Sequence, residues 1–151
     1  DLKLKDKIVL ITGGTGGIGR AMTKAFLEEG CKVAITGRTQ AKLDSFAEEL
    51  NVGDRLWTCA GDIMIEEDVA KFVNGAAEFF GGIDVLCPNA GIESYYQEIK
   101  DFSKDNYDRS FNTNVLGVCY TIKYAVPYML KKGKGSIIVT GSNGSNLAAL
   151  A

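Results

Sequence analysis

A glycine-rich segment near the start of the chain has the residue types and spacing of a phosphate-binding turn. Residues 12–19 read TGGTGGIG; they follow an apolar run and precede a helical pattern through Ala21, Phe26 and Leu27. Glycines allow a sharp turn and let bare backbone approach a diphosphate, while the N–H groups of the following helix face the anion. The strand-turn-helix context favours a dinucleotide site over a purely structural turn. The candidate binding residues are Gly13, Thr15, Gly16, Gly17, Ile18 and Gly19.

The residue that ends the second strand of a dinucleotide-binding fold lies beside the adenosine ribose, so its charge selects the cofactor. Here the apolar run at residues 32–36 is followed by Gly37, Arg38 and Thr39, with no acidic residue to bind the 2′-hydroxyl of NAD. A guanidinium can form forked, charge-assisted hydrogen bonds with the 2′-phosphate of NADP. The sequence therefore favours NADP(H) over NAD(H). The alternatives for Arg38 are a solvated charge that opens the next helix and a guanidinium stacked on adenine.

The composition excludes several other classes of function. The 151 residues include no His, which rules out Ser-His-Asp hydrolysis and His-ligated zinc. A formal net charge of −2 argues against a nucleic-acid or membrane partner held by bulk electrostatics. No apolar run approaches the roughly 18 residues that a membrane span needs, and no signal-peptide pattern opens the chain. We therefore expect a cytoplasmic protein with no metal site, no nucleic-acid partner and no membrane contact.

The four cysteines, Cys31, Cys59, Cys87 and Cys119, each lie in an apolar stretch, and no two of them form a C-x-x-C pair. Free cysteine in such surroundings behaves as a small buried hydrophobe. We therefore expect four buried, reduced thiols rather than a disulfide or a metal site, as is usual for cytosolic proteins.

Short apolar runs alternate with amphipathic helical stretches along the whole chain. Runs rich in Val, Ile and Leu without clean alternation are typical of strands covered on both faces. Between them, apolar residues recur at helical spacing, which predicts helices over residues 40–50, around residues 69–80 and over residues 106–131. The alternation predicts one α/β domain over residues 1–151, a doubly wound parallel sheet with helices on both faces. The predicted strands are residues 7–12, 32–36, 55–60, 83–87 and 136–140.

Five motifs in this order resemble those of the short-chain dehydrogenase/reductase family. Besides the glycine-rich turn, they are GDI at residues 61–63, NAG at 89–91, TNVLG at 113–117 and IIVTGS at 137–142. Pro88 stands where the family usually has another Asn. The resemblance covers essentially the whole chain and implies a Rossmann-like sheet with strand order 3-2-1-4-5. It also implies cofactor contacts from Asp62, which would meet the adenine, and from Ile63, Asn89, Ala90 and Gly91.

The resemblance implies hydride transfer between the nicotinamide C4 of the cofactor and a carbonyl or alcohol carbon of a small-molecule substrate. Ser142 would hydrogen-bond the substrate oxygen. In the family a Tyr supplies the proton, with its pKa lowered by a Lys one helical turn later. Asn114 would hold a water that links this Lys to solvent.

That Tyr-x-x-x-Lys pair is expected about four residues beyond Ala151. Two such pairs, Tyr96/Lys100 and Tyr128/Lys132, occur within the chain, but both precede Ser142 and neither is expected to be catalytic. We therefore expect the chain to be the first part of a longer protein and to bind the cofactor without turnover. The alternative functions are an NAD(H)-dependent alcohol dehydrogenase of the same family and a nucleotide-binding protein without catalysis, either a fragment or a sensor.

The resemblance further implies that the helix at residues 106–131 pairs with its equivalent in a second subunit, forming homodimers or homotetramers. Tyr120, Tyr124 and Tyr128 recur every four residues, which predicts either an interface strip or ordinary core packing. The segment at residues 92–103, with Tyr95 and Tyr96, is expected to form one wall of the substrate pocket.

Overall fold

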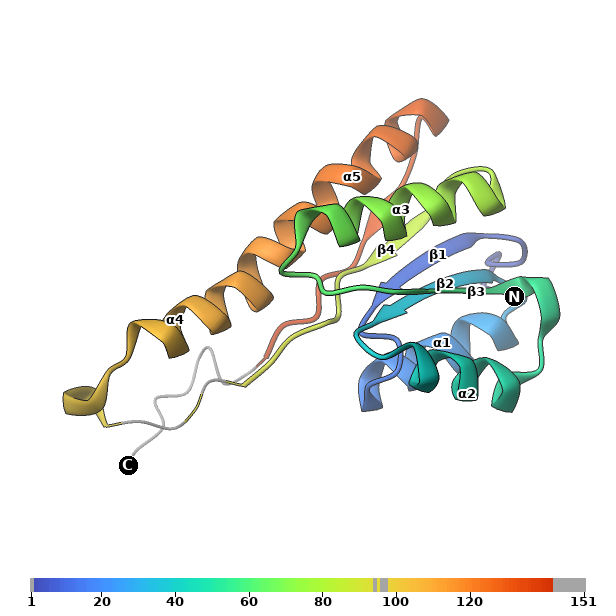
Figure 1. The fold of residues 1–151 in the computed structure, drawn as a ribbon. Coiled ribbons are helices and arrows are strands. Elements are labelled where there is room, and N and C mark those ends of the chain that lie inside the picture. The colour runs from blue at the N-terminus through green and yellow to red at the C-terminus, as the bar shows by residue number, and fades with distance from the viewer. Residues whose placement is uncertain (1, 94, 96–97, 143–151) are drawn as a thin grey trace.

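The computed structural model describes residues 2–93, 95 and 98–142, and Figure 1 shows a twisted sheet with helices packed against it. The sheet has five parallel strands in the order β3-β2-β1-β4-β5. The predicted doubly wound sheet and its strand order are thereby confirmed. The strands are β1 (Ile8–Thr12), β2 (Lys32–Gly37), β3 (Leu56–Ala60), β4 (Val85–Cys87) and β5 (Ser136–Ile137).

Helices cover both faces of the sheet. Successive residues of the central strands point to opposite faces, so each strand contributes to two apolar clusters. Leu10 of β1 packs in one apolar cluster with Phe72 and Ala125, whereas its neighbours Val9 and Ile11 belong to a second cluster. Among the described residues, no helix is both long enough and apolar enough to cross a membrane. The covering helices are α1 (Gly17–Glu28) and α2 (Gln40–Leu50) on one face, and α3 (Glu66–Phe80) and α5 (Gly117–Lys132) on the other (Figure 1).

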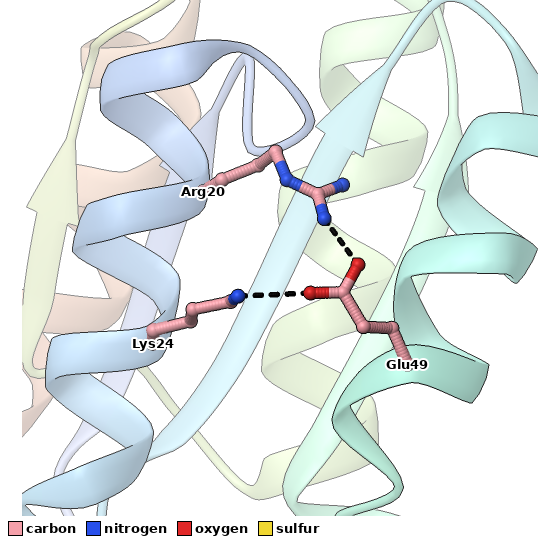
Figure 2. A network of polar contacts seen from close by, with 3 residues as sticks. All are labelled: Arg20, Lys24 and Glu49. Carbon is pink, nitrogen blue, oxygen red and sulfur yellow. Dashed lines mark hydrogen bonds and ion pairs between the residues drawn. The ribbon is translucent and has the colours of Figure 1, made fainter.

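One carboxylate joins α1 and α2 at the surface. Glu49 of α2 accepts hydrogen bonds from Arg20 and from Lys24 of α1, the latter at 2.8 Å (Figure 2). The Arg20 guanidinium also lies over the Phe46 ring, with its Cζ 3.9 Å from the ring centroid. The hydrogen bonds from Lys24 and Arg20 lower the pKa of Glu49. Because these side chains are exposed to solvent, the cluster contributes little to the stability of the fold.

Strand β5 is shorter than predicted, but its pairing continues beyond its two residues. The Ile138 N–H donates a hydrogen bond to the Leu86 carbonyl at 2.9 Å, and the Thr140 N–H donates to the Pro88 carbonyl at 3.1 Å. The predicted run at residues 136–140 therefore follows β4 along its length, with a regular strand only at its start.

The helix predicted over residues 106–131 is longer than expected and is not regular. It comprises α4 (Lys104–Phe111), a π-helical segment η3 (Asn112–Leu116) and α5, and α4 extends away from the sheet (Figure 1). The expectation of one regular α-helix is therefore wrong at residues 112–116, because apolar spacing does not register a local change from i→i+4 to i→i+5 hydrogen bonding. Two short 3₁₀ turns, η1 (Gly53–Arg55) and η2 (Ile99–Asp101), precede β3 and α4.

The three regularly spaced tyrosines of α5 pack against α3 in the same chain. Tyr124 Oη donates a hydrogen bond to Glu66 at 2.9 Å, and Tyr128 Oη donates to Asn74 at 2.9 Å. Tyr120 packs against the apolar cluster that contains Leu10, Phe72 and Ala125. The structure thus favours core packing over an interface strip for these side chains. The exposed apolar residues of this long helix are instead Tyr107, Phe111, Val115, Leu116 and Leu130.

Three of the four cysteines are buried as expected, and all four are free thiols. Burial raises the pKa of Cys87 to about 11, so this thiol stays protonated at neutral pH. Cys119 is exposed, which corrects the prediction. Its neighbours in the sequence are apolar, but neighbouring residues on a helix point in different directions, so a short apolar stretch does not place every member in the core.

Asp84, just before β4, links the first strand to the last helix. Its carboxylate, 10% exposed, accepts hydrogen bonds from the Ile8 N–H at 2.9 Å and from Lys132 Nζ at 2.6 Å. Burial alone would raise the pKa of Asp84, but the hydrogen bonds from Lys132 and Ile8 outweigh it and lower the pKa below its ordinary value. The folded chain therefore stabilises the charged carboxylate.

Replacing Asp84 with Asn should lower the free energy of unfolding by about 2 kcal/mol at neutral pH, because it breaks a largely buried ion pair. Since the folded pKa is lowered, this stabilisation is fully present above the unfolded pKa near 4 and is lost as pH falls through the folded pKa. In urea unfolding, the difference between wild type and Asp84→Asn should therefore shrink as the pH falls below about 4. The exposed Asp54→Asn serves as the control. An undiminished difference at low pH would contradict the role of the charge.

Candidate functional site

Three glycines of the turn are required by the fold itself, and at one of them, Gly14, a Cβ would lie 2.5 Å from Ile35 Cβ. Gly13 has a φ of +69°, and a Cβ built there would lie 2.9 Å from Ala90 Cα. A Cβ at Gly19 would lie 2.1 Å from the Gly13 carbonyl oxygen. Without side chains, the turn closes through the Gly16 N–H, which donates to the Gly13 carbonyl at 3.1 Å. These positions need glycine for a left-handed conformation and for close approach within the protein.

Gly16 and Gly17 have no such reason within the protein to lack a side chain. Among the described residues, a Cβ at Gly17 would meet no atom within 4 Å, and one at Gly16 only the Gly13 carbonyl oxygen at 3.4 Å. Neither residue has a positive φ. Helix α1 begins at Gly17 with no side-chain hydrogen bond at its N-cap and no acidic residue in its first turn. Bare N–H groups and the positive end of the helix dipole therefore face open space, which fits a phosphate group.

Thr12 at the end of β1 ties this turn to the NAG segment after β4. Its Oγ1 accepts hydrogen bonds from the N–H groups of Asn89 and Ala90, both at 3.0 Å. Asn89 Nδ2 donates to the Thr12 carbonyl at 3.1 Å, and Thr140 Oγ1 donates to Asn89 Oδ1 at 3.2 Å. Asn89 therefore braces three neighbouring segments of the sheet edge, and this role needs no ligand.

A cleft of about 560 Å³ opens where the chain leaves β1, β2, β3 and β4. In doubly wound sheets, ligands bind at these carboxyl ends. The structure brings together along this cleft every residue predicted to contact the cofactor: Gly13, Thr15, Gly16, Gly17, Ile18, Gly19, Arg38, Asp62, Ile63, Asn89, Ala90 and Gly91. The other lining residues, which were not predicted to contact the cofactor, are Thr36, Gly37, Gly61, Met64, Ile92, Arg109 and Thr113.

Arg38 lies exposed at the cleft, directly after β2. Its guanidinium has no hydrogen-bond or ion-pair partner among the side chains that the structure describes. Thr15 is close by, because its Oγ1 lies 3.0 Å from the Cβ position of Gly37. An unpaired guanidinium and a hydroxyl that line the same cleft suit a phosphate group.

Asp62 directs the chain after β3 along the edge of the cleft. Its N–H donates a hydrogen bond to Asp68 Oδ2 at 2.8 Å, and its Oδ1 accepts one from the Met64 N–H at 2.9 Å. One carboxylate oxygen of Asp62 is thus used within the turn. In the described part of the chain, no group of three or more His, Cys, Asp or Glu side chains is placed to hold a metal ion.

The start of α5 sits directly on the segment after β3. A Cβ at Gly117 would lie 2.9 Å from the Ile63 carbonyl oxygen and from its Cδ1, so only glycine permits this contact. Thr113 and Arg109 lie four and eight residues before Gly117 on the same long helix, and both line the cleft. The sequence carries no motif for Arg109, and no local pattern indicates its place at the cleft.

Asn114, within η3, holds the segment that follows the NAG motif. Its Nδ2 donates to the Ile92 carbonyl at 2.8 Å, and its Oδ1 accepts from the Ile92 N–H at 2.8 Å. Asn106 holds Tyr95 with the same pair of bonds, at 3.1 and 3.2 Å. Asn114 does not itself line the cleft, but it positions Ile92, which does.

The predicted catalytic Ser142 is exposed and is not among the residues lining the cleft. The two Tyr-x-x-x-Lys sequences also lie away from it where they are described. The Tyr128 hydroxyl donates a hydrogen bond to Asn74, and the Lys132 amine donates one to Asp84. In the other sequence, Lys100 pairs with Glu98 at 2.7 Å, and Tyr96 lies outside the described residues.

A smaller cavity of about 240 Å³ lies between α4 and the segment that precedes it. Its lining includes Tyr95 and Phe102 from that segment and Tyr107 and Phe111 from α4. The Tyr107 and Phe111 rings stack with their centroids 4.3 Å apart. The predicted pocket wall at residues 92–103 therefore contributes to an aromatic cavity, although this cavity and the cleft have no lining residue in common.

Residues 7–150 match the short chain dehydrogenase family. The chain is 38% identical over 141 residues to an uncharacterized oxidoreductase, YvrD, of Bacillus subtilis (strain 168), covering 91% of this chain and 52% of the relative. It is 35% identical over 146 residues to cis-2,3-dihydrobiphenyl-2,3-diol dehydrogenase of Paraburkholderia xenovorans (strain LB400), covering 94% of this chain and 52% of that enzyme. The chain spans about half the length of these curated relatives.

The fold agrees with solved structures along nearly the whole chain. It matches 3-ketoacyl-(acyl-carrier-protein) reductase from Brucella melitensis, complexed with NADH, with a TM-score of 0.88 and 34% identity over 95% of this chain and 60% of that chain. It matches levodione reductase with a TM-score of 0.89 and 28% identity over 95% of this chain and 57% of that chain. On the sequence match over residues 7–150 and on this fold, the chain belongs to the short-chain dehydrogenase family of oxidoreductases.

Proposed function

We propose that the cleft binds NADP(H) and that the protein interconverts a ketone or aldehyde and an alcohol by hydride transfer. The observation that carries the proposal is the bare backbone at Gly16 and Gly17, which no packing within the chain requires, together with the unpaired guanidinium of Arg38 on the same cleft. A pyrophosphate accounts for the first feature and a 2′-phosphate for the second. The relative complexed with NADH and the dehydrogenase relative support a nicotinamide dinucleotide in this family.

Different residues of the cleft would hold different parts of such a cofactor. The N–H groups between Gly13 and Gly19 that the protein itself leaves unbonded would bind the pyrophosphate, Arg38 and Thr15 the 2′-phosphate, and Asp62 with Ile63 the adenine. When bound, the nicotinamide ring donates or accepts a hydride at C4. The NAG segment, which the hydrogen bonds between Asn89 and Thr12 hold against the end of β1, would form the rest of the site.

We assign the chemistry of the substrate oxygen to Ser142, which would hydrogen-bond it, and to a Tyr and Lys expected beyond Ala151. Asn114 would support this group through its position in η3. Ile92 engages one N–H and one oxygen lone pair of its amide, which leaves a second donor and a second acceptor site for the water that links the Lys to solvent. π-helical turns are frequent at functional sites.

Calorimetric titration of the chain with NADPH and with NADH tests the proposal. We expect NADPH to bind more tightly than NADH, and we expect no NADPH oxidation with ketone or aldehyde substrates, because no Tyr–Lys pair of the described residues lines the cleft. Tighter binding of NADH would favour the NAD(H)-dependent alternative. Absence of affinity for both dinucleotides in a folded sample would remove the proposal, and turnover by this chain would contradict the expected position of its acid.

We also propose that the protein assembles as a homodimer or homotetramer through the long helix formed by α4, η3 and α5. Phe111, Val115 and Leu116 on this helix are 48%, 48% and 38% exposed, and apolar side chains gathered on a surface favour an interface. Sedimentation equilibrium measures the mass directly. A monomer at micromolar concentration would remove this proposal without affecting the cofactor site.

A further inference from the structure

Among the residues that the structure describes, Arg109 alone has a buried side-chain polar atom without a hydrogen-bond partner. The atom is Nη1 of its guanidinium. The guanidinium Cζ lies 4.6 Å from the centroid of the Tyr95 ring, and no described carboxylate pairs with it. Buried donors in native proteins are nearly always satisfied, and a charged donor is the costliest one to leave without an acceptor. The Arg109 guanidinium therefore needs a hydrogen-bond acceptor that the described part of the chain does not provide.

Arg109 is not needed to hold its surroundings together. The segment that carries Tyr95 is docked on the helix by the paired hydrogen bonds of Asn106 and Asn114. Tyr95 is itself 65% exposed, so its contact with the guanidinium buries little surface. An arginine kept for structure typically forms forked bonds with carboxylates or carbonyls, and the Arg109 guanidinium has none in the described chain.

The fold places Arg109 at a definite end of the cleft. Gly117 packs directly on Ile63, and Thr113 and Arg109, four and eight residues earlier on the same long helix, both line the cleft. This column forms the helical wall next to Asp62 and Ile63. The glycine-rich turn, by contrast, leads from β1 into α1, and α1 lies on the opposite face of the sheet from α5.

We propose that Arg109 recognises the adenine ring of the bound dinucleotide, an assignment that rests on the proposed function. Adenine offers ring nitrogens that accept hydrogen bonds and a π face on which a guanidinium stacks. Binding gives the Arg109 guanidinium the acceptor that it lacks. The Tyr95 ring restrains the guanidinium plane beforehand, which reduces the conformational entropy lost on binding.

The test compares Arg109→Met, which keeps much of the side-chain length but no donor, with wild type in titrations of AMP, NADP⁺ and nicotinamide mononucleotide. AMP and NADP⁺ should each bind about ten-fold more weakly to Arg109→Met, the effect of one charge-assisted hydrogen bond, while nicotinamide mononucleotide binding stays unchanged. Arg109→Lys should recover part of the affinity. Lys104→Met, whose amine pairs with Asp108 on the same helix, is the control and should bind as wild type.

Thermal melting separates recognition from a structural role. Without ligand, Arg109→Met should melt at the same temperature as wild type or higher, because the substitution removes an unsatisfied buried donor. A lower melting temperature with unchanged AMP affinity, or an equal loss of affinity for nicotinamide mononucleotide, overturns the assignment of Arg109. If wild type binds neither AMP nor NADP⁺, the proposed function itself fails, and this result is distinguishable because it precedes any substitution.

Discussion

A chain carrying Gly17→Ala should fold normally and bind NADPH about two orders of magnitude more weakly than wild type. The added methyl meets no protein atom within 4 Å. Alanine is also a better helix former than glycine by up to about 1 kcal/mol, so thermal stability should equal or exceed that of wild type. The same methyl fills the space in which phosphate oxygens would reach the N–H groups at the start of α1. Fluorescence titration and a thermal melt of one sample measure both effects.

Gly19→Ala provides the matched control, because it adds the same methyl two residues later in the same turn. There the methyl would lie 2.1 Å from the Gly13 carbonyl oxygen. We expect a loss of about 3 kcal/mol in unfolding free energy, with or without ligand, from this overlap. If stably folded Gly17→Ala binds NADPH as wild type does, the phosphate lies elsewhere and the central support for the cofactor site is gone.

The sheet and the strand-end residues of the cleft could be predicted because local sequence determines both. Val9, Leu10 and Ile11 are fully buried, as an unbroken apolar run in a covered strand predicts. Parallel strands bring their carboxyl ends to one edge, so residues that directly follow such runs gather there whatever the details of packing. Arg38 and Asp62 reach the cleft for this reason.

The helical wall could not be predicted in the same way, because it depends on contacts between distant segments. Phe111 and Val115 are apolar residues at helical spacing, yet they are exposed, while Tyr124 lies against α3. The π-helical segment changes which residues of the long helix share a face. Arg109 borders the cleft only because Gly117 packs on Ile63, a contact between segments that are far apart in the sequence.

Replacing Arg38 with alanine should weaken NADPH binding by about one to two orders of magnitude and leave NADH binding nearly unchanged. This corresponds to about 1.4–2.8 kcal/mol, in the range of a charge-assisted contact with a phosphate. NADH has no 2′-phosphate and therefore no such contact to lose. Arg38 is exposed and has no described partner, so its truncation should not change the unfolding free energy measurably. Parallel calorimetric titrations with the two cofactors give the ratio of dissociation constants directly.

A matched pair of variants distinguishes a specific contact from a general effect of positive charge. Lys42→Ala removes one exposed cation near the start of α2, outside the cleft, and should leave both affinities unchanged. A general effect would appear in both variants and would fall with added salt. Arg38→Lys keeps the charge but not the planar fork, so it should recover only part of the NADPH affinity. Equal losses of NADPH and NADH in Arg38→Ala would mean that the guanidinium contacts a group common to both cofactors, such as the adenine face, and the preference for NADP(H) would then have no residue to account for it.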